Sequence, residues 1–226
     1  MRAATLGDAT ASEFTDALLR IGEGRLPIDP IDGLANVAPF STVVGSIDEL
    51  TEKVCPHLLR KFQDLDWLSE RAILCSKNST ADVINIRLTT QLPGEARTLA
   101  STDSTLTEDE ATEFPVELLN SLGPVGIPPH LLNVKVGTPL ILMRNLDPPR
   151  LCNGTTLAVK SLSPNLITAT IMTGCGKRGV ALLPRMLMVP SEDLSFTFKR
   201  VQFPVRQSFA MTINKSQRQS LKVAGV

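Results

Sequence analysis

The sequence lacks a hydrophobic run long enough for a membrane-spanning helix, which needs about 18 or more consecutive apolar residues. Its opening residues, MRAATLGDATASEF, contain neither the apolar core of a signal peptide nor the acid-poor composition of a transit peptide. These two absences predict an intracellular protein that does not associate with a membrane.

Cysteine and histidine are also scarce, with four and two residues in a chain of 226. Their spacing fits neither a zinc site nor a disulfide framework, so no metal site is predicted. Free, buried thiols in a reducing compartment are expected instead. A catalytic pair of Cys55 and His57 is the alternative, but neighbours in sequence are not thereby aligned in space.

No phosphate-binding P-loop of the form GxxxxGK[ST] is present. The nearest candidate, GCGKRG at Gly174–Gly179, contains a Gly–Lys pair. However, Ile171 occupies the place of the first glycine, and Arg178 stands where Ser or Thr would hold the metal. This segment is therefore predicted to be a hairpin turn with two exposed cations, Lys177 and Arg178.

Acidic residues are rare in the second half of the chain. Residues 121–226 contain 13 Lys and Arg against 3 Asp and Glu, whereas residues 1–120 contain 10 against 20. The net charge of zero thus divides into −10 and +10. A basic half favours a polyanionic partner, because each cation near a phosphate releases counterions. The alternative is that the two halves attract each other within one fold.

Helical spacing of apolar residues predicts helices over residues 8–21 and after Ser46. Ser46 and Glu49 have the spacing of a capping box, and Pro56 should end that helix early. A short buried strand follows at Ala72–Cys75.

A helix is expected to begin near Ser79 or Thr80, and with the preceding strand it forms a βα unit typical of parallel sheets. Lys77 and Asn78 lie between strand and helix, where open α/β sheets commonly bind ligands. They are candidates for a phosphate contact, and ordinary helix capping with exposure to solvent is the alternative.

The apolar period changes from helical to strand-like after Gly123–Pro129 (GPVGIPP), which is the clearest boundary in the sequence. Short β-rich runs separated by turn residues follow, and they predict a small barrel of about four or five strands. The phenylalanines at 196, 198, 203 and 209 are expected in the core rather than as platforms for stacking bases.

A cluster of polar residues follows an apolar run in SFAMTINKSQRQSL, Ser208–Leu221. Thr212, Asn214, Lys215 and Ser216 offer hydroxyl, amide and ammonium groups. Such groups bind phosphate oxygens without reading base sequence. The segment therefore predicts contact with a nucleic-acid backbone.

Six segments occur in one order over nearly the whole chain: MRA, WLSERAILCSKNSTADVINIRL, LPGEARTLASTDS, FPVELLNSLGPVGIPPHLLNVKVGTPLILMRNLDPP, LCNGTTLAVKSL and VQFPVRQSFAMTINKSQRQSLKVAGV. Together they resemble the Pif-type DNA helicases. This RecD-like group includes the helicase part of Helitron transposons and belongs to the RecA-fold helicases of superfamily one.

The resemblance implies an α/β fold, namely a partial second RecA-like domain of the P-loop NTPase type with a small all-β, SH3-like barrel insertion. Residues 1–65 would be a helical segment that joins from a first RecA-like domain missing from this sequence. Residues 66–130 and 191–226 would form the two parts of the second domain, and residues 131–190 the 2B-type barrel. The chain is then expected to be truncated.

The resemblance also implies site residues. Arg2 would be an arginine finger for the terminal phosphate of ATP, with a mobile terminal arginine as the alternative. Thr212, Asn214, Lys215 and Ser216 would hold the DNA backbone.

Gln217 and Gln219 would couple the DNA track to the nucleotide. Arg218 stands where the family has glycine, so it either damages this coupling or adds a cation to the DNA track. The positive residues of the barrel segment are further candidates for following single-stranded DNA: Lys135, Arg144, Arg150, Lys160, Lys177 and Arg178.

The implied cofactors are ATP and Mg²⁺, held mainly by the missing first domain. This chain alone is expected to hold neither and to hydrolyse no ATP. The implied partners are single-stranded DNA and DNA forks, with 5′ to 3′ movement and roles in repair, recombination and telomere maintenance. The implied location is the nucleus of a eukaryote, or the mitochondrion.

Three hypotheses about function remain open at this point. The chain is a portion of an ATP-dependent DNA helicase, or it is a truncated, non-catalytic remnant that binds single-stranded DNA. The third hypothesis is a protein-interaction module that uses the β-barrel.

Overall fold

The computed structural model describes residues 16, 19–30, 33, 41–105, 112–190, 196–217 and 219–226. The chain divides into two compact units, residues 1–50 and 51–226. Most of the helix predicted over residues 8–21 lies outside the described residues, although residues 19–22 are helical. None of the helices described here is long and apolar enough to cross a membrane.

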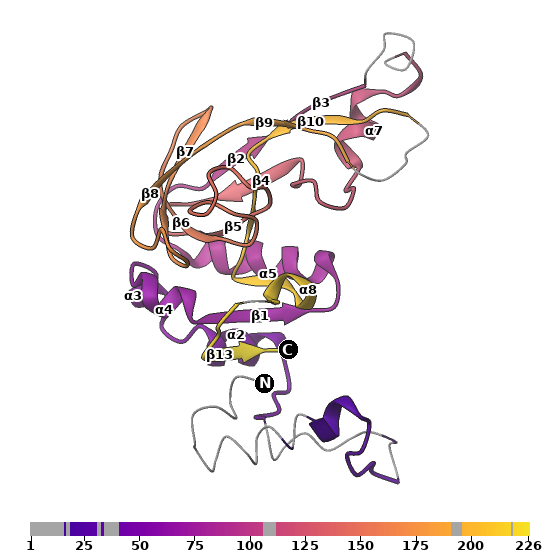
Figure 1. Ribbon diagram of the computed structural model, residues 1–226, viewed down its shortest axis with the longest axis vertical. Helices are drawn as coiled ribbons and strands as arrows, with labels where there is room; N and C mark the ends of the chain where they lie inside the picture. Colours follow the sequence, from indigo (N-terminus) through magenta and orange to yellow (C-terminus); the bar gives the residue numbers. More distant parts are fainter. Residues whose placement is uncertain are drawn as a thin grey trace. The chain divides into compact units, whose positions relative to one another are not determined.

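The larger unit combines helices and strands (Figure 1). The helices with defined bounds are α2 (Ile47–Val54), α3 (Leu58–Lys61), α4 (Leu65–Ser69), α5 (Asn78–Gln91), α7 (Val116–Ser121) and α8 (Ile213–Ser216). The strands are β1 (Arg71–Cys75), β2 (Arg97–Ala100), β3 (Thr102–Ser104), β4 (Leu131–Val134), β5 (Pro139–Leu142), β6 (Thr156–Leu162), β7 (Leu166–Ile171), β8 (Val180–Pro184), β9 (Met186–Met188), β10 (Lys199–Gln202), β11 (Val205–Gln207), β12 (Ala210–Thr212) and β13 (Val223–Gly225). The mixed α/β character predicted from the sequence is confirmed.

Helix α2 begins with a modified capping box. The Ser46 hydroxyl accepts the Glu49 backbone N–H at 3.1 Å, as predicted, but the Glu49 carboxylate accepts the backbone N–H of Gly45 at 3.0 Å. The carboxylate thus reaches one residue further back than in the standard motif. The helix ends at Val54, so the early stop predicted at Pro56 is confirmed.

The predicted βα unit is present as β1 and α5. Strand β1 lies in the middle of a parallel sheet of order β12–β1–β13. The register pairs Cys75 with Thr212, so the carboxyl ends of β1 and β12 lie side by side. Helix α5 packs on both of these strands, and in Figure 1 it lies between β1 and β5 together with α8.

A second, antiparallel sheet has the order β11–β5–β6–β7–β8. Four of its strands come from residues 131–190, and the fifth, β11, comes from Val205–Gln207. Buried and exposed residues alternate along β7 and β8, as expected for strands with one face on a core. Strand β4 instead pairs with β2, and β10 pairs with β3 and β9.

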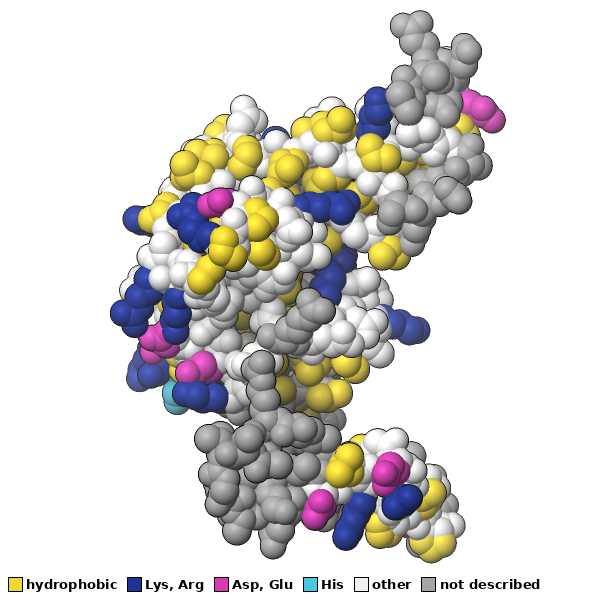
Figure 2. Space-filling view, in the orientation of Figure 1, with side chains coloured by type: hydrophobic (Ala, Val, Ile, Leu, Met, Phe, Trp, Pro, Cys, Tyr) yellow, Lys and Arg dark blue, Asp and Glu magenta, His cyan; other side chains and the backbone are white. Residues whose placement is uncertain are grey.

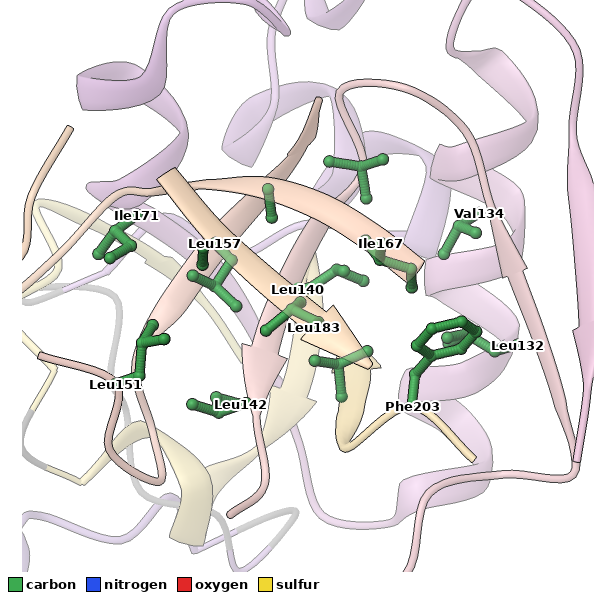
Figure 3. Packing of buried hydrophobic residues seen from close by; sticks show 14 of the residues in the cluster. Leu132, Val134, Leu140, Leu142, Leu151, Leu157, Ile167, Ile171, Leu183 and Phe203 are labelled. Carbon is green, nitrogen blue, oxygen red and sulfur yellow. The ribbon is translucent and has the colours of Figure 1, made fainter. Parts of the chain in front are cut away.

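The largest hydrophobic core lies on the inner face of this antiparallel sheet (Figure 3). Phe203 is fully buried there among leucines from several strands, and Leu99 joins from β2. Phe198 and Phe209 are also buried, and Phe196 packs against Phe114, so the prediction that these rings belong to the core is confirmed. The labelled residues in Figure 3 are Leu132, Val134, Leu140, Leu142, Leu151, Leu157, Ile167, Ile171, Leu183 and Phe203.

A buried ion pair connects β10 with β3. Arg200 donates from Nε to Asp103 Oδ1 at 2.8 Å and from an NH2 nitrogen to Oδ2 at 2.5 Å, and neither side chain is exposed. The guanidinium also donates to backbone carbonyls at Leu119, Leu122 and Pro128. These bonds fix both ends of Gly123–Pro129, the glycine- and proline-rich segment that the sequence indicates as a boundary.

The cysteines are all free, but they differ in burial. Cys55 and Cys75 are buried, Cys152 is half-buried and Cys175 is exposed, so the prediction of buried thiols is wrong for Cys175. Burial raises the pKa of the Cys55 thiol to about 11, a shift that Arg71 opposes and Glu52 reinforces. A protonated thiol is a poor nucleophile, which argues against the Cys55–His57 pair. No cluster of His, Cys, Asp and Glu among the described residues is arranged to hold a metal ion.

Candidate nucleic-acid interface

The two polar segments predicted to contact phosphate lie next to each other in the fold. Each follows the carboxyl end of a strand in the parallel sheet: α5 begins at Asn78 after β1, and α8 begins at Ile213 after β12. Cys75 and Thr212 are partners in the register, so the two strand-to-helix turns leave the sheet at the same edge. Ligands commonly bind at this edge of parallel sheets.

Three of the predicted residues line one small cavity of about 10 Å³ at this edge: Asn78, Thr212 and Lys215. Its other polar lining residues are Asp82, Asn85, Arg206 and Gln207, and the side chains of Ile141 and Met211 are apolar parts of its wall. The cavity is about the size of one water molecule. The fold therefore brings a hydroxyl, an amide and an ammonium group together from two separate segments.

The remaining predicted residues of these segments lie around this cavity without lining it. Lys77 is exposed at the N-cap of α5, where its side chain makes no capping hydrogen bond. Asn214 is exposed on α8, and Ser216 donates its hydroxyl to the carbonyl of Ile213 at 2.7 Å. Arg2 and Arg218 lie outside the described residues.

Arg206 is a member of the cluster that sequence reasoning missed. It donates to Asn78 Oδ1 at 3.1 Å and to Asp82 Oδ2 at 3.2 Å, and its side chain is only 18% exposed. Its buried Nε has no hydrogen-bond partner among the described residues. Buried donors are nearly always paired, so this nitrogen is an exception that the surrounding side chains leave without an acceptor. A single cationic residue on a short strand does not by itself predict a binding site from the sequence.

The charge of Lys215 is weakened by its surroundings. The pKa of the Lys215 ammonium is lowered to about 8, mainly by burial and also by the nearby Arg206, whereas Asp82 opposes the shift. Lys215 forms no ion pair within 4.0 Å with any described acid. A half-buried, unpaired ammonium next to a second cation favours an anion at this position.

Asn85 on α5 holds β12 in place beneath this cluster. Its side chain is buried, accepts the Ala210 backbone N–H at 2.8 Å and donates to the Ala210 carbonyl at 2.8 Å. The same amide nitrogen lies 3.4 Å from the Gln207 carbonyl. Gln207 in turn donates to the hydroxyl of Thr89 and to the carbonyl of Asn133. These bonds fix the direction in which the chain enters α8.

Gln217 and Gln219 lie elsewhere, along a larger cavity of about 690 Å³. This cavity is formed by Gln217, residues 219–222, the end of α4 with Glu70, and the loops of the antiparallel sheet around Gly154 and Gly174. Gln219 donates to the carbonyl of Gly154 at 3.1 Å. The structure therefore separates these two glutamines from Lys215 and places them against the antiparallel sheet.

Part of the charge asymmetry along the sequence is used in ion pairs within the fold. Acids of residues 1–120 pair with bases of residues 121–226 in Asp82–Arg206, Asp103–Arg200, Glu70–Lys222 and the contacts of Asp66 with Lys177 and Arg178. The interpretation that the halves attract each other thus holds for these residues. On the face shown in Figure 2, Lys and Arg side chains lie in separate groups rather than in one stripe.

Two structural findings limit the cations available to DNA. Lys135 is buried and donates to the carbonyls of Thr90 at 2.9 Å and Leu92 at 2.6 Å, at the end of α5. Lys135 is therefore not one of the cations that could follow DNA, as the sequence suggested, because its ammonium already donates to these carbonyls at the helix end. The turn at Gly174–Gly179 is confirmed as the β7–β8 hairpin, but its cations are paired rather than free.

Comparison with known protein families gives one match. Residues 117–162, which include most of α7 and strands β4 to β6, match the family model described as DNA helicase Pif1, 2B domain. No curated protein matches the chain.

Several solved structures are similar to the chain. Unliganded Pif1 from Bacteroides sp. is 19% identical with a TM-score of 0.46, and the match covers 70% of this chain and 45% of that one. Pif1 helicase from Candida albicans is 20% identical with a TM-score of 0.47, covering 76% and 44%. Bacteroides sp. Pif1 in complex with ADP-AlF4 is 18% identical with a TM-score of 0.48, covering 94% and 42%.

The chain thus spans less than half of the length of these three proteins. The 2B-domain match confirms that the chain resembles the Pif-type DNA helicases, over the segment from Glu117 to Leu162.

Proposed function

We propose that this chain is part of a Pif1-type, ATP-dependent DNA helicase and that the cluster of Asn78, Thr212, Lys215 and Arg206 holds the backbone of single-stranded DNA. The observation that carries the proposal is their convergence on one cavity at the carboxyl ends of two parallel strands. In the complete enzyme, ATP hydrolysis would drive this grip along one strand from 5′ to 3′ and unwind duplex DNA.

The chemistry of the cluster suits a phosphodiester. Lys215 and Arg206 supply positive charge, and the Thr212 hydroxyl and the Asn78 amide supply neutral donors. Groups of these kinds can bind phosphate oxygens, and contacts to phosphate carry no base sequence information. Binding of this kind depends on phosphate charge and is independent of base sequence, as a translocating motor requires.

The domain organisation of this proposal follows the family. The β12–β1–β13 sheet with α5 is part of a second RecA-like domain, assigned to residues 66–130 and 191–226. The antiparallel sheet is the SH3-like 2B insertion at residues 131–190, extended by β11 from the returning chain. Residues 1–65 join it to a first domain that binds most of the ATP and Mg²⁺. Arg2, Gln217, Arg218 and Gln219 belong to the nucleotide side of the coupling.

The proposed role places the complete protein in DNA repair, recombination or telomere maintenance, in the nucleus or the mitochondrion. Forked DNA and single-stranded DNA are its partners. Binding of single-stranded DNA is the part of the proposal that can be tested with this chain alone.

Replacing Lys215 by alanine is expected to weaken binding of a labelled oligothymidine about three- to tenfold at low salt. The loss of one phosphate contact should also reduce the slope of log affinity against log salt by about 0.7, the value for one charge on a single strand. Fluorescence anisotropy across a salt series measures both quantities.

Lys61→Ala is the matched control, because Lys61 is exposed on α3 and its replacement removes the same charge. Equal losses in the two variants would mean that Lys215 contributes only net charge, and the proposed grip would then be wrong.

The affinity for single-stranded DNA is expected to fall as pH rises through about 8. The pKa of Lys215 lies near this value because burial opposes its charge, so the ammonium is present below pH 8 and is lost above it. Binding to an oligodeoxyadenosine, whose base does not titrate in this range, can be followed from pH 6.5 to 9. Lys215→Ala should flatten the profile, and an unchanged profile in that variant would assign the titration to another group.

A further inference from the structure

The β7–β8 hairpin carries two adjacent cations that converge on one carboxylate. Lys177 Nζ lies 2.7 Å from Asp66 Oδ1, and an NH2 nitrogen of Arg178 lies 3.1 Å from Asp66 Oδ2. We propose that Lys177 and Arg178 form a second binding site for a phosphodiester of single-stranded DNA, and that Asp66 occupies this site when no DNA is bound. This inference rests on the proposed function and adds a site and its occupant to it.

The hairpin holds the two cations in a fixed arrangement. The backbone N–H groups of Lys177, Arg178 and Gly179 donate within the turn to the carbonyls of Gly174, Ile171 and Gly176. The Arg178 residue itself adopts a left-handed backbone with φ of 68°. A non-glycine residue in this region costs energy and is found where the surroundings determine it, often at binding sites.

Two glycines make this geometry possible. A Cβ at Gly176 would lie 2.4 Å from Cγ of Arg150, and one at Gly179 would lie 2.9 Å from the carbonyl oxygen of Gly176. The turn can therefore pack only with hydrogen at both positions. The two cations are presented by a preformed turn and need little ordering when a ligand arrives.

The geometry of the contact matches a phosphate. A single carboxylate bridges the ammonium and the guanidinium with one oxygen to each. Two non-bridging oxygens of a phosphodiester carry the same single negative charge and can make the same two contacts. Asp66 thus holds the position that a DNA phosphate would take.

Asp66 is suited to leave this position. Its side chain is 47% exposed, and those of Lys177 and Arg178 are 46% and 76% exposed. Hydrogen bonds from Lys177 and Arg178 lower the pKa of Asp66, so it is ionised at neutral pH. Exposed ion pairs of this type are weak because water screens them, and a polyanion can displace one carboxylate.

The neighbouring cavity gives a DNA strand room to approach. Lys177 lines the cavity of about 690 Å³ together with Gln217, Gln219 and Lys222. Gln217 comes directly after α8, which carries Lys215. The cavity therefore lies between the chain that leaves α8 and the hairpin that carries Lys177.

Replacing Asp66 by asparagine is expected to tighten binding of a labelled oligothymidine about three- to tenfold at low salt. Two released cations should also steepen the salt slope by up to about 1.4, twice the value for one contact. Glu23→Gln is the matched control, because Glu23 is 49% exposed, pairs with Arg25 at 3.3 Å and lies in the other unit of the chain. Each substitution removes one negative charge from the chain, but only Asp66→Asn releases Lys177 and Arg178 from their ion pairs.

Removing the hairpin cations in the Asp66→Asn background, as Lys177→Ala with Arg178→Ala, should cancel the gain. Equal effects of Asp66→Asn and Glu23→Gln would overturn the inference, even where Lys215→Ala still weakens binding. Tightening by Asp66→Asn with no effect of Lys215→Ala would uphold it and refute the grip at α8. If neither the unaltered chain nor Asp66→Asn binds the oligonucleotide, both proposals fail.

Discussion

Replacing Arg200 by methionine is expected to lower the free energy of unfolding by about 3–5 kcal/mol. The variant leaves the Asp103 carboxylate in a site where its side chain has no exposed surface, without the guanidinium that balances its charge. It also leaves the carbonyls of Leu119, Leu122 and Pro128 without their donor. Urea denaturation followed by circular dichroism measures the loss.

The double variant Arg200→Met with Asp103→Leu is the control that separates charge from packing. Replacing both partners of a buried pair by apolar residues is often neutral or stabilising, so this variant should recover most of the lost stability. A loss below about 1 kcal/mol in Arg200→Met alone would show that water reaches the carboxylate. Hydrogen exchange at residues 119–128 should rise in the single variant, since Arg200 holds that segment.

The sequence predicts local elements well where short-range chemistry decides them. The strand at Ala72–Cys75, its following helix and the stop of α2 before Pro56 depend on apolar period and on proline, and all appear in the structure. The hairpin at Gly174–Gly179 also follows from its own residues. Patterns of this kind need no knowledge of what packs against them.

Tertiary partners decide the features that the sequence does not predict. Lys135 has the same formal charge as Lys177. Only the fold shows that its ammonium donates to a carbonyl at the end of α5 instead of facing solvent. Arg206 and Asn85 are separated from their partners by more than a hundred residues, so no local pattern reveals their contacts. The opposite charges of the two halves of the sequence are likewise compatible with a polyanionic partner and with internal pairing. Only the ion pairs in the fold show that the halves pair with each other.

The candidate site shows the same division between local and tertiary information. The types of residue at Asn78, Thr212 and Lys215 suggest phosphate contacts, but their convergence follows from the parallel pairing of β1 with β12. The sequence placed Gln217 and Gln219 in one motif with Lys215. The fold turns them toward the Gly154 loop, since the chain leaves α8 before it enters β13.

Asn85→Ala is expected to cost about 2–4 kcal/mol of stability and to weaken single-strand binding about tenfold or more. The substitution removes the donor to the Ala210 carbonyl and the acceptor for its N–H, and each buried group left unpaired costs about 1–3 kcal/mol. Because these bonds set the path of β12 into α8, their loss also displaces Lys215. Denaturation and anisotropy, both carried out well below the melting temperature, measure the two effects.

Asn165→Ala, at an exposed position between β6 and β7, is the control for removing an amide. Asn85→Asp keeps the shape but puts a carboxylate opposite the carbonyl of Ala210, so it should be at least as harmful as alanine. If Asn85→Ala loses stability but binds DNA as tightly as the unaltered chain, the position of α8 does not depend on this amide. The grip would then be carried by α5 and Arg206, and Arg206→Ala would become the decisive variant.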